Sequence, residues 1–178
     1  YTACYTLSLH DALPIFTALP HQAAGEVLTL PAERSSVRWE GAAVKHLVDE
    51  SGGYPYFLQQ FGQDSWNLAN AVDVITEIDA KVGAASGWRA LDNGFFRARW
   101  DRATKSEQAY LRAMAKDGDD GSSSGEVARR LRRKSTSLGP TRAALISKGL
   151  VYAPEHGRVQ FTVPGMATFI TRQPDPDA

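Results

Sequence analysis

The sequence predicts a mainly α-helical protein in two parts, with a single β-hairpin close to its C-terminus. Three observations predict this fold class. Apolar residues recur at helical spacing in most segments between residues 40 and 148. Helix-capping signatures occur at Thr76 and Thr104. Alternation of apolar and polar residues, which is typical of a strand, is clear only over residues 158–163.

Residues 5–15 read YTLSLHDALPI and resemble a translation of a common short-read sequencing adapter. A secretory signal is the alternative, but it needs a positively charged start and an uninterrupted apolar stretch. This segment has no Lys or Arg before Arg34, and it contains His10 and Asp11. We therefore exclude residues 1–15 from fold reasoning and expect the chain to be the C-terminal part of a longer protein.

Composition excludes several classes of protein. Without the adapter, about 160 residues remain, enough for one ordinary domain or two small ones. No segment approaches the roughly 20 apolar residues of a membrane helix, so no membrane partner is expected. Cys4, the only cysteine, lies in the excluded segment, which leaves no thiol for disulfides or metal ligation. A cytoplasmic location is the corresponding expectation.

Two helices are expected on either side of a glycine-rich turn. The first runs over residues 40–50 and should stop at Gly52 and Gly53. The second starts after the break at Pro55 and covers residues 56–69, with apolar side chains along one side.

A third helix is expected over residues 76–96, with Thr76 as its N-cap. Gly83 and Gly87 are points where it can be interrupted, because glycine weakens a helix interior. Large aromatic residues in and around these helices are expected to form core and interdomain contacts rather than platforms for stacking bases. They are Trp66, Trp88, Phe95, Phe96 and Trp100.

The second half of the chain contains shorter elements. Thr104 followed by Glu107 forms a capping box that opens a helix reaching Ala115. Residues 116–125 are polar and rich in glycine, which predicts a loop. A short helix is then expected over residues 126–134, with an apolar inner face.

Another helix is expected with Thr136 or Ser137 as its cap, Pro140 in its first turn and Gly149 just past its end. A hairpin with strands over 150–153 and 158–163 completes the chain. Three helices followed by a hairpin is the order of a winged helix-turn-helix, in which the hairpin is the wing.

Three segments carry a resemblance to a known family. They are SGGYPYFLQQFG at 51–62, LDNGFFRARWDRATKSEQAYLRAMA at 91–115 and SLGPTRAALISKGLVYAPEHGRVQFTVP at 137–164. From about Leu30 to Arg172 the chain resembles the C-terminal half of bacterial AAA+ and STAND P-loop ATP-binding proteins related to the origin-recognition ATPases. The resemblance implies a helical lid over residues 16–98, a winged helix over 99–172 and a disordered acidic tail over 173–178.

In that family the lid closes over a nucleotide held by the preceding core. The resemblance implies that Gly53, Tyr54 and Pro55 lie against the adenine. Glycine permits close approach of the backbone, and proline offers a rigid apolar face. The spacing also allows a purely structural interpretation, in which Gly52 and Gly53 end one helix and Pro55 begins the next.

No catalytic residue is assigned in this chain. It contains no G-x-x-x-x-G-K-[ST] loop, so by itself it should neither hydrolyse ATP nor bind it tightly. The resemblance implies a parent ATPase, switched by ATP or ADP with Mg²⁺ in an upstream P-loop core, that can form a homo-oligomer. Arg89 could replace the arginine of the family's lid, but we do not assign it. His46 and His156 have no partner at metal-ligand spacing.

A basic cluster suggests an anionic partner. Between Glu126 and Lys148 there are seven cations and one acid, a net charge of +6 in a chain whose formal net charge is zero. On the expected helix over 126–134, Arg129 and Arg133 share one face, and Arg130 and Lys134 share a neighbouring face. Candidate contacts to duplex DNA are Arg129, Arg130, Arg133, Lys134, Arg142, Lys148 and, in the wing, Arg158.

Two hypotheses remain open for this cluster. Six phosphate contacts would give a log–log salt dependence of about −5 for DNA binding. Alternatively, the basic face docks on acidic parts of the parent or of another protein, as an interaction or autoinhibitory module that does not bind DNA.

Overall fold

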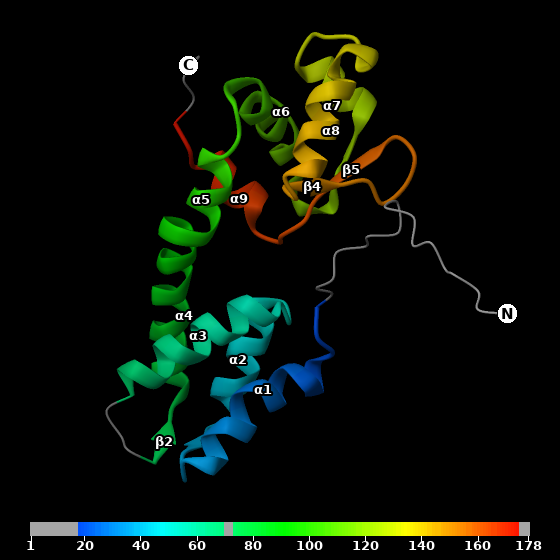
Figure 1. Ribbon diagram of the computed structural model, residues 1–178. Coiled ribbons are helices and arrows are strands. Elements are labelled where there is room, and N and C mark those ends of the chain that lie inside the picture. Colours follow the sequence, from blue (N-terminus) through cyan, green and yellow to red (C-terminus); the bar gives the residue numbers. More distant parts are fainter. Residues whose placement is uncertain (1–17, 70–72, 175–178) are drawn as a thin grey trace, which may run out of the picture. The chain divides into compact units, whose positions relative to one another are not determined.

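The computed structural model describes residues 18–69 and 73–174 (Figure 1). The adapter-like segment lies outside these ranges. The protein is mainly α-helical, with a small three-stranded antiparallel sheet near the C-terminus, which confirms the predicted helical class. Its described residues divide into two compact units between Arg97 and Ala98. We call residues 18–97 the N-terminal unit and residues 98–174 the C-terminal unit. Within the described ranges, no helix is long and apolar enough to cross a membrane.

The N-terminal unit is built from helices joined by one short parallel strand pair. In chain order the elements are α1 (His21–Arg34), β1 (Arg38–Trp39), α2 (Gly41–Ser51), α3 (Pro55–Leu68), β2 (Val74–Ile75), α4 (Glu77–Leu91) and a π-helical turn, η2 (Asp92–Phe96). β1 and β2 pair in parallel. The next helix, α5 (Arg97–Asp101), begins at the last residue of this unit.

Local signals set the ends of α2, α3 and α4 as the sequence predicts. Gly52 ends α2 in the left-handed conformation, with φ +58°. Pro55 occupies the first turn of α3, where its missing N–H removes no helical hydrogen bond. The Thr76 side chain accepts from the Asp79 backbone N–H, and the Asp79 carboxylate accepts in return from the Thr76 N–H at 2.9 Å. These three boundaries are therefore confirmed.

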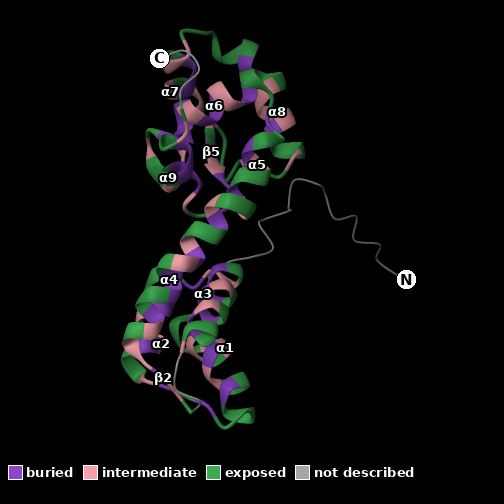
Figure 2. Ribbon diagram, turned by 90° about the vertical axis from the view of Figure 1, so that its left-hand side faces the viewer, coloured by how far each residue is buried: buried purple, intermediate pink, exposed green. Residues whose placement is uncertain are grey.

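The expected interruption of α4 at its glycines is wrong. α4 continues through Gly83 and Gly87, and both residues are buried. A Cβ atom on Gly83 would overlap the backbone of Ser65 on α3, and one on Gly87 would overlap the ring of Phe61. The glycines therefore serve close packing between α3 and α4, and this benefit outweighs their low helix propensity. Figure 2 shows the buried residues running along both helices.

An aromatic cluster fills the space beside this contact. The Phe57 ring lies 5.3 Å from Trp88, 5.8 Å from Phe95 and 5.8 Å from Phe96, all edge-on. Such tilted pairs are the favoured geometry between aromatic rings. Phe96 and, in the C-terminal unit, Trp100 are buried as predicted for core residues, whereas Trp88 and Phe95 are half-buried and Trp66 is 39% exposed.

Helix α1 is absent from the sequence prediction for a physical reason. No side chain caps its N-terminus, and Pro31 lies inside it. Both features contradict the usual signals for a helix. Ala24, Leu28 and Ala32 are nevertheless buried on one face of α1. Tertiary packing on α2 and α3 therefore stabilises this helix.

The C-terminal unit alternates short helices with short strands. After α5 the elements are α6 (Lys105–Ala115), η3 (Gly118–Asp120), β3 (Ser122–Ser123), α7 (Ser124–Arg130), η4 (Ser135–Leu138), α8 (Gly139–Ser147), β4 (Val151–Tyr152), β5 (Arg158–Phe161) and α9 (Met166–Thr171). The strand order is β3–β5–β4, and both pairings are antiparallel. The capping box of Thr104 and Glu107 is confirmed at the start of α6.

Three predictions for this unit need correction. The loop expected over 116–125 contains β3, so the hairpin becomes a three-stranded sheet. The helix expected over 126–134 is α7, which ends at Arg130, and Arg132 has a φ of +53°. Arg133 and Lys134 therefore share no helix face with Arg129 and Arg130. The next helix, α8, begins at Gly139 after a 3₁₀ turn, and its N-cap is Leu138 rather than Thr136 or Ser137.

Helix α9 and its cap are also missing from the sequence prediction. The Asp119 carboxylate accepts from the backbone N–H of Gly165 at 2.6 Å and of Ala167 at 3.1 Å. This carboxylate satisfies the N-terminus of α9 from more than 40 residues away, so no local pattern marks it. The expected tail begins in contact with α6, because Arg112 donates to the carbonyl oxygens of Gln173 and Pro174. Residues 175–178 lie outside the described ranges.

Candidate nucleic-acid interface and nucleotide-contact segment

The backbone of Gly53 is already occupied by contacts within the N-terminal unit. Its carbonyl accepts from the Leu19 N–H at 2.8 Å, and its own N–H donates to the Val48 carbonyl at 3.3 Å and the Ser51 hydroxyl at 3.2 Å. A Cβ atom on Gly53 would lie 2.6 Å from the Leu19 carbonyl oxygen. The close approach that glycine permits here is therefore to Leu19.

Tyr54 and Pro55 are the accessible part of the predicted nucleotide-contact segment. Both are partly exposed. The Tyr54 ring lies 4.7 Å from the ring of Phe57, which fixes its position at the start of α3. These two side chains could contact an adenine ring from outside, whereas Gly53 has no free backbone group to offer.

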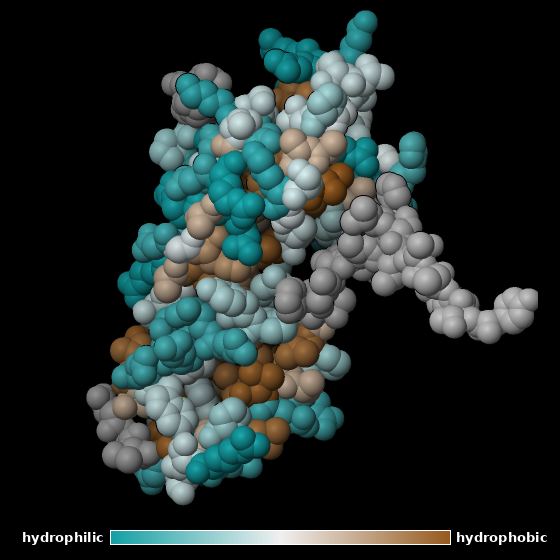
Figure 3. Space-filling model, in the orientation of Figure 1, coloured by the Kyte–Doolittle hydropathy of each residue, from teal (hydrophilic) through white to brown (hydrophobic). Residues whose placement is uncertain are grey.

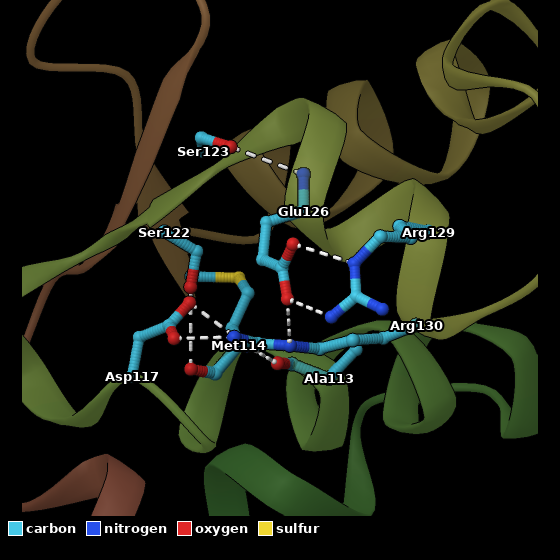
Figure 4. A network of polar contacts seen from close by, with 8 residues as sticks. All are labelled: Ala113, Met114, Asp117, Ser122, Ser123, Glu126, Arg129 and Arg130. Atoms are coloured by element: carbon cyan, nitrogen blue, oxygen red, sulfur yellow. Dashed lines mark hydrogen bonds and ion pairs between the residues drawn. The ribbon is translucent and has the colours of Figure 1, made fainter.

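Arg130 lies at the centre of a polar network in the C-terminal unit (Figure 4). Its guanidinium donates to both carboxylate oxygens of Asp117, at 2.8 and 2.5 Å, and to Glu126 at 2.9 Å. It also donates to the carbonyl of Ala113, at the end of α6, at 2.7 Å. Only 17% of the Arg130 side chain is exposed. Arg130 therefore ties α7 to α6 and to the segment before β3, and it is not free to contact DNA.

The same network lowers the pKa values of its two acids. For Glu126, hydrogen bonds from Arg129, aided by the charges of both arginines, lower the pKa to about 2. For Asp117, the hydrogen bonds from Arg130 lower the pKa. A carboxylate whose pKa falls on folding stabilises the folded state above its unfolded pKa, and this stabilisation is lost as the pH falls toward the folded pKa.

We expect the Glu126 carboxyl group to titrate with a midpoint near pH 2 in the folded protein, far below the ordinary 4.5 of a glutamate. The network then stabilises the C-terminal unit above about pH 4.5 and weakens progressively between pH 4.5 and 2. Carbon-detected NMR of the carboxyl group, in the wild type and in Arg129→Ala, measures this midpoint. The variant should titrate closer to 4.5, and a wild-type midpoint near 4.5 would contradict the network.

Lys148 is likewise engaged within the unit. Its ammonium group donates to the Glu107 carboxylate at 2.6 Å and to the Arg102 carbonyl at 3.0 Å. Only 5% of the Glu107 side chain is exposed. Its burial opposes ionisation, but hydrogen bonds from Lys148 and Thr104 outweigh this and lower the Glu107 pKa. Lys148 therefore compensates the negative charge of the buried Glu107 and joins the end of α8 to the start of α6.

Three consecutive cations between α7 and α8 have no such partners. Arg132, Arg133 and Lys134 are all exposed, and none forms a hydrogen bond or ion pair through its side chain with another described residue. The connection that holds them lies at one end of the unit in Figure 1, and hydrophilic side chains cover this end in Figure 3. Arg133 and Lys134 are sequence candidates, whereas Arg132 was counted only in the charge of the cluster.

The remaining candidate DNA contacts are neither fully exposed and unpartnered nor buried in an ion pair. Arg129 is 74% exposed but forms two hydrogen bonds with Glu126, at 2.8 and 2.6 Å. Arg158, at the start of β5, donates to the Asp120 carbonyl at 3.1 Å and lies 3.6 Å from the Glu155 carboxylate. Arg142 lies on α8, is partly buried and has no such partner among the described residues.

The exposed side of α8 is small and apolar rather than basic. Its exposed residues are Gly139, Pro140, Ala143, Ile146 and Ser147. None of them can form a charged or bidentate contact with a base edge. For metals, the described ranges contain no cluster of three or more His, Cys, Asp or Glu side chains that could hold an ion.

Comparison with protein families gives one match in the C-terminal part. Residues 93–170 match a family described as a domain of unknown function (DUF8462). The matched span includes α6, α7, α8 and the whole sheet. Curated proteins show no match to the chain.

Proposed function

We propose that the C-terminal unit is a winged helix-turn-helix module that binds duplex DNA mainly through phosphate contacts. In this proposal α6, α7 and α8 are its three helices, and the β4–β5 hairpin is the wing. The order of the elements, the short connection between α7 and α8 and the packing of both helices on α6 support this assignment.

The observation that carries the proposal is the exposed run Arg132–Lys134 in the helix–helix connection, whose side chains have no partner among residues 18–69 and 73–174. Cations with no partner in the protein are free to neutralise phosphates and to release the counterions around DNA. Arg130 and Lys148 belong to internal ion pairs and are no longer candidates for contact. The apolar exposed side of α8 favours binding to the backbone over readout of base edges.

We also propose that the N-terminal unit is the lid of a parent AAA+ or STAND-type ATP-binding protein. The likeness of residues 51–62 to lid sequences supports this, as does the all-helical packing of α1 to α4. The upstream core would hold ATP or ADP with Mg²⁺, and Tyr54 and Pro55 would lie against the nucleotide. In such a protein this chain supplies no catalytic residue, and the nucleotide state would govern when the DNA-binding module is available.

The test is a titration of the chain against a fluorescently labelled duplex at several salt concentrations. Phosphate contacts by Arg132, Arg133 and Lys134 contribute about −3 to the log–log slope. The triple variant Arg132→Ala, Arg133→Ala, Lys134→Ala should flatten this slope by about 3 and weaken binding more than tenfold at low salt.

The matched control is Arg34→Ala, Arg38→Ala, Arg89→Ala, which removes the same charge from exposed positions in the N-terminal unit. It should leave the slope unchanged. Wild-type binding that is absent or insensitive to salt would reject the DNA-binding proposal.

A second candidate function is a protein-binding or autoinhibitory module. The apolar exposed side of α8 favours it, in particular Ile146, which is 39% exposed. If the duplex titration fails, the variant Ile146→Lys separates this function from no function at all. It should abolish association with a protein partner while leaving the fold intact, because Ile146 is not in the core.

A further inference from the structure

Arg142 differs from every other cation in the proposed interface. It lies on α8 and is partly buried, and its side chain forms no ion pair or hydrogen bond with another described residue. Its Nε atom is fully buried without an acceptor, whereas the two terminal guanidinium nitrogens are not fully buried. The inner part of the guanidinium is thus removed from water while its outer edge remains accessible.

A partly buried guanidinium without an acceptor is destabilising, because the lost hydration is not replaced. Four acids of this unit have other partners. Glu107 binds Lys148, Asp117 and Glu126 bind Arg130, and Asp119 caps α9. Among the described residues, none forms an ion pair with Arg142. The accessible outer edge of this guanidinium can therefore bind an acceptor supplied from outside the chain.

The element beneath Arg142 is α6, on which α8 packs. Tyr110 of α6 is buried, which raises its pKa, and the positive charge of Arg142 opposes part of that rise. The Ser124 hydroxyl, in the first turn of α7, is a second buried group without a hydrogen-bond partner among the described residues.

We infer that Arg142 forms a specific site for one phosphate group, which its accessible terminal guanidinium nitrogens would bind. The planar guanidinium can donate hydrogen bonds to two phosphate oxygens at once, and its partial burial fixes its orientation before binding. This inference rests on the proposed function for the source of the phosphate, which is the backbone of the duplex. Arg132, Arg133 and Lys134 then attract DNA by charge, and Arg142 sets the position of the protein on it.

Substituting lysine for arginine distinguishes bidentate hydrogen bonding to a phosphate from attraction by charge alone. Arg142→Lys keeps the positive charge but removes the planar fork and the Nε donor. In the full chain it should weaken duplex binding about tenfold with no change in the salt slope. Arg132→Lys is the matched control, because an exposed, solvated cation acts only through its charge, and it should change the affinity less than about twofold. Equal effects of the two variants would overturn the role of Arg142 in DNA binding.

Inorganic phosphate tests the site without DNA. At constant ionic strength, replacing chloride by phosphate should raise the melting temperature of the wild-type chain by about 3 °C and leave Arg142→Lys unchanged. If the wild type binds no duplex, the proposed function fails, yet selective stabilisation by phosphate would still support the site and assign it to a free phosphate. Equal stabilisation of both proteins, or of neither, would overturn the site itself.

Discussion

Replacing Gly83 with alanine is expected to destabilise the N-terminal unit by about 3 kcal/mol, although alanine is the better helix former by about 1 kcal/mol. The reason is the contact between α3 and α4, where an added Cβ atom would overlap the backbone of Ser65. Backbone atoms cannot move aside as a flexible side chain can, so the two helices would have to separate. Urea unfolding followed by far-UV circular dichroism measures the change.

The control for this prediction is Gly25→Ala, also in a helix interior. A Cβ atom on Gly25 would meet its nearest neighbour, a methyl group of Val44, at 3.4 Å, which is ordinary contact. This substitution should be neutral or stabilise the protein by up to about 1 kcal/mol. A Gly83→Ala variant as stable as Gly25→Ala would show that α3 and α4 are not in such close contact.

Arg130→Met should destabilise the C-terminal unit by about 2 kcal/mol. The substitution leaves the Asp117 carboxylate and the Ala113 carbonyl without their partner. Losing these partly buried hydrogen bonds costs more free energy than losing a surface ion pair. Amide hydrogen exchange of the α6 and α7 backbone measures the change in this unit alone.

Arg129→Met provides the matched comparison, because Arg129 binds the same Glu126 from an exposed position on the same helix. It should destabilise the unit less than Arg130→Met does, because the pair of Arg129 with Glu126 is exposed to solvent and Arg129 has no second partner such as Asp117. Similar losses from both substitutions would contradict the central role of Arg130. The contrast would also show that Arg130 stabilises the fold, which distinguishes it from the exposed cations Arg132–Lys134 that we propose as DNA contacts.

The predictable parts of the fold are those that depend on neighbours in sequence. Thr76 and Thr104 cap their helices through acids three residues later, and Gly52 and Pro55 separate α2 from α3, so a local pattern suffices. The features missed by sequence reasoning depend on distant partners. Asp119 caps α9 across more than 40 residues, and α1 forms despite Pro31 because of packing.

The candidate interface follows the same division. Composition alone located the basic cluster between residues 126 and 148, but it could not tell free cations from paired ones. The partners of Arg130 and Lys148 lie 13 and 41 residues away in sequence. Arg132 was missed as a contact because α7 was expected to continue to Lys134, whereas its early end places Arg132, Arg133 and Lys134 in one exposed turn.

At Arg132, the residue type that would best stabilise the left-handed backbone differs from the one that the proposed DNA contact needs. A φ of +53° costs a residue with a Cβ atom roughly 1 kcal/mol, and glycine adopts it without strain. Glycine at this position would stabilise the connection between α7 and α8, but it would also remove one of the three accessible charges. Stability and the proposed attraction for an anion therefore make opposite demands on Arg132.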